Sequence, residues 1–149
     1  MAGGRVDGDF ATLIGTRVKA LAVVAGRSLL DCAIDAAVGA GAAGVAVVGG
    51  PEVRAACASR VDCIIDESCL GSENLHRALW AWPHAPTLLL SSDLPFVQAE
   101  DVRRFIAAVP PRTLAMPLAR EEVYRRRFPN APARVTPRLG ERVANGCRF

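Results

Sequence analysis

The feature that most constrains the fold is an apolar, β-branched run at residues 45–48, which lies between two segments with helical periodicity. The run reads Val-Ala-Val-Val, which is typical of a strand that is buried on both faces. Residues 28–38 before it carry apolar side chains at helical spacing. Residues 51–59 after it begin with Pro51, which is tolerated at the first position of a helix. This order predicts an α/β domain with a mostly parallel sheet.

The same alternation continues along the rest of the chain. Its 149 residues are 51% hydrophobic, which suits one domain with a substantial core, so we expect a single domain over residues 1–149. The patterns predict a glycine-rich loop at 1–17, a short apolar segment at 19–24, strands at 61–65, 87–90 and 113–118, and helices at 74–82 and 98–109.

Composition excludes several classes of protein. The sequence lacks the run of about 18 apolar residues that a membrane-spanning helix needs. Its five cysteines are odd in number and form no C-x-x-C pair, which argues against a disulfide framework or a zinc site and for a reduced, cytoplasmic setting. Basic residues are scattered and aromatic residues are few, so we expect no nucleic-acid partner.

Three candidates follow predicted strands, where ligands of open parallel sheets bind: Gly49-Gly50, Asp66-Glu67 and Asp93. Asp93 comes after residues 87–90 and could hold a divalent cation, or it could form a turn before Pro95. Asp66 comes after residues 61–65.

Two further features could bind phosphate. The backbone amides of the Ala2-Gly3-Gly4 segment could cradle a phosphate group, or the segment could be a frayed terminus. Lys19 is the only lysine among 18 basic residues, and its compact charge suits a phosphate oxygen, although chance survival explains it as well.

A third candidate lies at the start of the predicted third helix, within Gly71-Ser72-Glu73-Asn74-Leu75. Asn74 could bind a base or a ribose hydroxyl. Alternatively, Ser72 or Asn74 could simply cap the helix.

These motifs, in this order, resemble the MobA-like nucleotidyltransferases, which have the nucleotide-diphospho-sugar transferase (GT-A) fold. The matching segments are Ala2-Gly3-Gly4-Arg5, Lys19-Ala20-Leu21 with Gly26-Arg27-Ser28-Leu29-Leu30-Asp31, Gly71-Ser72-Glu73-Asn74-Leu75, and Ser92-Asp93-Leu94-Pro95-Phe96. The resemblance implies a three-layer α/β/α sandwich of Rossmann-like type. It also implies that the family's first strand lies upstream of Met1, and that relatives run on past Phe149.

The resemblance further implies a chemistry. A phosphate on an acceptor, such as a sugar phosphate or a molybdopterin-like compound, attacks the α-phosphorus of a nucleoside triphosphate, and pyrophosphate leaves. Ala2, Gly3 and Gly4 would then hold the triphosphate, Lys19 would offset charge on the transferred group, and Asp93 would bind Mg²⁺. The resemblance thus favours the functional interpretation of Lys19 and Asp93.

By the same resemblance, Asn74 would help to seat the nucleoside, and Asp66 would lie near the base or ribose. The expected partners are a nucleoside triphosphate and a phosphorylated small molecule, without nucleic acid or membrane. Two alternatives stay open. One is an inactive nucleotide-binding or regulatory module of the same fold. The absent first strand would favour it, and so would Cys147 in Asn145-Gly146-Cys147, where the resemblance implies Gly-Gly-Asn. The other is a glycosyltransferase, which is disfavoured because Ser91-Ser92-Asp93 offers one aspartate where such enzymes often carry two.

Overall fold

The computed structural model describes residues 2–130, and the chain divides into two compact units, Met1–Arg104 and Phe105–Phe149. The expected single domain over residues 1–149 stays a prediction. Cys147 lies outside the described residues. In the part of the chain that the structure describes, no helix has both the length and the apolar character needed to cross a membrane.

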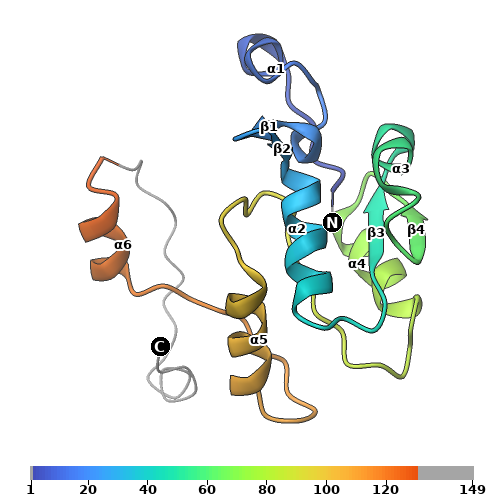
Figure 1. Ribbon diagram of the computed structural model, residues 1–149, viewed down its shortest axis with the longest axis vertical. Coiled ribbons are helices and arrows are strands. Elements are labelled where there is room, and N and C mark those ends of the chain that lie inside the picture. Colours follow the sequence, from blue (N-terminus) through green and yellow to red (C-terminus); the bar gives the residue numbers. More distant parts are fainter. Residues whose placement is uncertain (1, 131–149) are drawn as a thin grey trace. The chain divides into compact units, whose positions relative to one another are not determined.

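The first compact unit contains a parallel βαβ unit, seen on the right in Figure 1. Strand β3 (Ala46–Gly49) pairs with β4 (Cys63–Asp66), and the helix α3 (Pro51–Cys57) connects them. Both strands and the helix that begins at Pro51 are confirmed. A parallel pair needs a crossover of this kind, because a short turn cannot return the chain to the same end of the sheet.

The core forms where α2 (Leu29–Gly39), α3 and β3 meet. Its side chains are those of Ala2, Val18, Ala20, Leu30, Ile34, Val47, Val53 and Cys57. Gly49 at the end of β3 is required by this packing, because a Cβ there would lie 2.6 Å from Cγ1 of Val53. Burial raises the pKa of the Cys57 thiol, which suits a core role.

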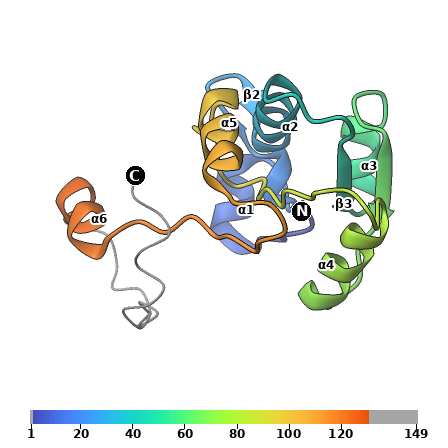
Figure 2. The same cartoon turned by 90° about the horizontal axis from the view of Figure 1, so that it is seen from below.

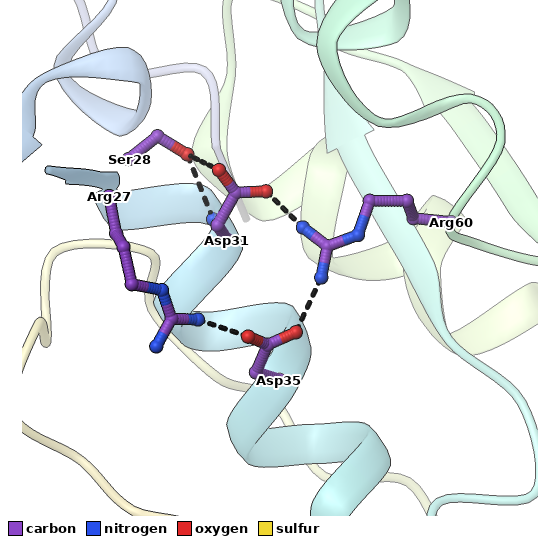
Figure 3. A network of polar contacts seen from close by, with 5 residues as sticks. All are labelled: Arg27, Ser28, Asp31, Asp35 and Arg60. Carbon is purple, nitrogen blue, oxygen red and sulfur yellow. Dashed lines mark hydrogen bonds and ion pairs between the residues drawn. The ribbon is translucent and has the colours of Figure 1, made fainter.

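Helix α2 is held at its N-terminus by polar contacts. The Ser28 hydroxyl caps the helix by accepting from the Asp31 amide at 3.0 Å. Arg60, which follows α3, forms ion pairs with Asp31 and Asp35, and Asp35 also pairs with Arg27 (Figure 3). The network therefore ties α2 to the chain that follows α3.

The N-terminal region contains a helix where a loop was expected. Helix α1 (Gly8–Ile14) interrupts residues 1–17, and Gly15 ends it with a left-handed backbone (φ 68°). The segment is closed by an antiparallel bridge between Arg5 and Val18. The loop prediction was wrong here. Phe10, Leu13 and Ile14 have helical spacing, but the helix is only seven residues long, which is shorter than the window over which such periodicity is judged.

Short elements follow this segment and lead into α2. They are the 3₁₀ turn η1 (Lys19–Leu21) and the antiparallel pair β1 (Val23–Val24) and β2 (Arg27–Ser28). The Gly26 backbone between the two strands has φ 80°, a conformation that glycine adopts without strain.

Three more helices follow β4. Helix α4 (Gly71–Trp80) begins three residues before the predicted start at 74, and it contacts β3 (Figure 2). Helix α5 (Ala99–Ala108) agrees with the predicted helix at 98–109. In the second unit, α6 (Glu121–Arg127) carries an ion pair between Glu121 and Arg125, one helical turn apart, at 2.7 Å.

Two predicted strands are wrong. Residues 87–90 and 113–118 form no strand, and the described residues contain no strand paired with either segment. Leu88, Leu89 and Leu114 are exposed. An apolar run becomes a strand only when a neighbouring strand satisfies its backbone groups. The α/β class with parallel pairing is therefore observed over two strands, and the three-layer sandwich stays a prediction.

Candidate functional site

Lys19 and Asp93 are 74 positions apart in the sequence and meet directly in the structure. The Lys19 ammonium donates to Oδ2 of Asp93 at 2.7 Å. The Lys19 side chain is 44% exposed and the Asp93 side chain 39% exposed, so a ligand can reach both. Both groups were predicted as site residues, and the structure brings them together.

Asp93 lies in a turn rather than at the end of a strand. Its position is set by its polar partners instead, since the Ser91 hydroxyl donates to Oδ1 while Lys19 holds Oδ2. The Lys19 ammonium, and after it the Ser91 hydroxyl, lower the pKa of the Asp93 carboxyl. Asp93 is therefore an anion at neutral pH, as a cation ligand must be.

The glycine segment lies beside Lys19. The Lys19 amide donates to the Gly4 carbonyl oxygen at 2.8 Å. The Ala2 amide donates to the carbonyl oxygen of Val48 at 2.9 Å, and Ala2 is buried in the core. The segment is thus anchored to β3, contrary to the frayed-terminus interpretation. The predicted residues Ala2, Gly3, Gly4 and Lys19 form one continuous stretch of the site.

Glu67, which the sequence singled out together with Asp66 as following a predicted strand but without a role, belongs to this region. A Cβ on Gly3 would overlap the Glu67 carboxylate, and a Cβ on Gly50 would lie 2.9 Å from its Oε1. Glycine at both positions therefore makes room for this side chain. Glu67 follows Asp66 directly after β4, where the rule that ligands bind at strand ends had placed it.

Asp66 and Asn74, both predicted to be near the nucleoside, have protein partners. Asp66 pairs with Arg54 at 2.6 Å, and its side chain is 80% exposed. Asn74 binds the backbone of Ser68 with both ends of its amide, accepting from Ser68 N at 2.6 Å and donating to Ser68 O at 3.0 Å. Neither Ser72 nor Asn74 caps α4, whose N-cap is Leu70. In this structure Asn74 holds the loop that follows Glu67.

The donor set at Asp93 suits a magnesium ion. Mg²⁺ prefers oxygen ligands and is commonly bound through one or two carboxylates, with water and phosphate at its other positions. Asp93 offers one exposed carboxylate, and Ser91 adds a neutral oxygen beside it. Among residues 2–130 no cluster of three or more His, Cys, Asp or Glu side chains could hold a metal, so substrate oxygens would have to complete the coordination.

The MobA-like NTP transferase domain matches this chain over residues 2–143. The chain belongs to this family. The match covers the glycine segment, Lys19 and Asp93, and it places the protein among nucleotidyltransferases with a nucleotide-diphospho-sugar transferase α/β fold. Comparisons with curated proteins and with solved structures gave no match.

Proposed function

We propose that this NTP transferase family member is an Mg²⁺-dependent nucleotidyltransferase. It would transfer a nucleoside monophosphate from a triphosphate to a phosphorylated small molecule, such as a sugar phosphate or a molybdopterin-like compound. The observation that carries the proposal is the contact between Lys19 and Asp93 beside Gly4, which supplies a cation and an anion next to the backbone of the glycine segment. We also propose that the complete fold is a three-layer α/β/α sandwich.

The reaction would form one bond and break one bond at the α-phosphorus. An oxygen of the acceptor phosphate attacks this atom, the bond to the bridging oxygen breaks, and pyrophosphate leaves with the electron pair. Such a transfer depends on positioning and on charge stabilisation more than on a covalent catalyst. Lys19 supplies positive charge to the transferred group, and the exposed Gly4 lets the phosphates approach the backbone.

The other residues of the site would position the nucleotide. Asp93 would hold Mg²⁺, which when bound neutralises phosphate charge. Glu67 lies against Gly3, and its acceptor oxygens suit the hydroxyl or amino groups of a nucleoside. Asn74 would act indirectly, by holding the backbone of the loop after Glu67. Asp66 would be peripheral, since it pairs with Arg54.

The proposal is tested by thermal stabilisation with each of the four nucleoside triphosphates in the presence of Mg²⁺. We expect one of them to raise the melting temperature of the wild-type chain, and Lys19→Ala and Asp93→Asn to lose this effect. Glu100→Gln is the matched control, because it removes the same kind of charge from an exposed pair with Arg103. It should respond as the wild type does.

The outcomes distinguish the functions under consideration. Stabilisation followed by pyrophosphate release with a phosphorylated acceptor supports the transferase. Stabilisation without pyrophosphate release for any acceptor tried identifies a nucleotide-binding module instead. If the chain responds to no triphosphate, or if Asp93→Asn responds fully, the proposed site is wrong.

A further inference from the structure

The two oxygens of Asp93 are held by two different kinds of donor. Oδ1 accepts from the hydroxyl of Ser91, two residues earlier in the same turn. Oδ2 accepts from the ammonium of Lys19, which comes from a distant part of the sequence. One donor is therefore local and neutral, while the other is remote and charged.

The neutral donor determines how the carboxylate is oriented. The terminal torsion of an aspartate is broad, so an isolated carboxylate can present either oxygen in many directions. Hydrogen-bond partners behind a metal-binding carboxylate commonly orient it for the metal. Ser91 can do this for Asp93, because its short side chain is attached to the same turn and needs little ordering.

The ammonium of Lys19, the charged donor, occupies a position from which a metal ion could bind Oδ2 of Asp93. An ammonium group is a compact cation on a flexible four-carbon chain, and here it is 2.7 Å from Oδ2. A magnesium ion binds a carboxylate oxygen at about 2.0–2.1 Å, so an ion that binds Oδ2 from the side of Lys19 would compete with the ammonium. The partly exposed Lys19 side chain leaves room for the ammonium to move away.

We propose that Ser91 is a positioning residue: its hydrogen bond fixes Asp93 so that Oδ2, now bound by Lys19, is presented to a divalent cation that replaces the ammonium. This inference rests on the proposed function, because it assigns the cation to Asp93. The ammonium released from Asp93 is then free to bind a phosphate oxygen of the nucleotide. Binding of the cation and binding of the nucleotide would therefore support each other.

The first test measures Mn²⁺ affinity by electron paramagnetic resonance, with the nucleoside triphosphate that best stabilises the wild-type chain. Ser91→Ala should weaken Mn²⁺ binding about tenfold, because the carboxylate loses its orienting partner. Ser91→Thr keeps the hydroxyl and should stay near the wild-type affinity. Ser59→Ala, which removes an exposed hydroxyl elsewhere, is the matched control, and the melting temperatures of all variants are compared without ligand.

The second test uses Lys19→Met without nucleotide. Removing the competing cation should tighten Mn²⁺ binding about fivefold, since a charge about 4 Å away in water is worth roughly that factor. With nucleotide present the same variant should bind the nucleotide more weakly than the wild type does. A merely structural Lys19 would not produce these opposite effects.

Three results would overturn the inference. Ser91→Ala could bind Mn²⁺ as the wild type does, Ser91→Thr could be as weak as Ser91→Ala, or Lys19→Met could fail to tighten Mn²⁺ binding in the absence of nucleotide. If the wild-type chain binds no Mn²⁺ with any triphosphate, the proposed function itself fails. That result is distinguishable from the other three, in which wild-type binding is intact.

Discussion

Residues 46–49 and 87–90 are both short apolar segments, and the structure treats them in opposite ways. Strand β3 is paired with β4, and its Val48 is 3% exposed. The segment at 87–90 is in no sheet of the described chain, and its Leu89 is 45% exposed. Apolar composition is similar in the two segments, so the difference arises from their neighbours. A strand is stabilised by a paired backbone and by helices that cover its faces, and only β3 has both.

The largest expected effect comes from placing a charge in each segment. Val48→Asp should lower the free energy of unfolding by about 4 kcal/mol or more, because it puts an unpaired carboxylate in the core. Leu89→Asp should change it by no more than about 0.5 kcal/mol, because the side chain is solvated. Urea unfolding followed by circular dichroism measures both. Comparable losses in the two variants would show that residues 87–90 are buried in solution and would remove the contrast.

The next effect concerns the packing of α3 on β3. Gly49→Ala should cost about 1–3 kcal/mol, because the new methyl group meets Val53, and Val53→Ala should cost about 2 kcal/mol by leaving a cavity. In the double variant the added methyl group occupies part of that cavity, so its loss should be about 1 kcal/mol smaller than the sum. Gly71→Ala is the control, since nothing lies near a Cβ there. Simple additivity would contradict the close contact.

The comparison also explains what sequence reasoning could and could not predict. The strand at 45–48 was identified because it is flanked by Pro51 and a glycine-rich turn, and because its own pattern is β-branched. A strand at 87–90 was predicted from apolar composition alone. Composition does not tell whether another strand lies beside the segment to pair with it. Helix α1 was missed because seven residues are too few for a clear helical pattern.

The candidate site was likewise predicted only in part from the sequence. Lys19 was singled out by its residue type, and Asp93 by its expected place after a strand, although that strand does not form. Glu67 was identified by its place after a strand, but the room that Gly3 leaves for it could not be predicted. Ser91 was given no role, because its importance depends on a contact with Asp93 that is made in space. The role of Asn74 could not be predicted either. In the sequence, an asparagine that binds the Ser68 backbone cannot be distinguished from any other polar residue near the start of a helix.

A smaller loss of stability is expected in the loop after β4, because the side chain of Asn74 holds this loop where β3 is held by the hydrogen bonds of a paired strand. Asn74→Ala should cost about 1–2 kcal/mol, because it leaves the Ser68 amide and carbonyl without this partner. Hydrogen exchange at the Ser68 amide should accelerate in the variant. Asn74→Asp keeps the acceptor and should retain part of the protection. Unchanged exchange in Asn74→Ala would mean that this amide does not hold the loop.

The smallest effect is expected from the ion pairs around α2. Arg60→Met should lower stability by about 1 kcal/mol or less at low salt, since its partners Asp31 and Asp35 are partly exposed. The loss should shrink in 1 M NaCl, where charges are screened. Arg17→Met, which breaks only the exposed pair with Asp7, is the control and should cost less. A loss of several kcal/mol that is insensitive to salt would show that Arg60 belongs to the core.

The central claim is that a nucleotide binds where the glycine segment meets Lys19 and Asp93. At 15.7 kDa the protein suits a titration followed by nuclear magnetic resonance of its backbone amides, with Mg²⁺ and each triphosphate in turn. The account predicts that one triphosphate gives its largest shifts at Gly3, Gly4, Lys19 and Asp93, and only small shifts in α6. Saturable shifts centred on another part of the chain, or none with any triphosphate, would contradict it.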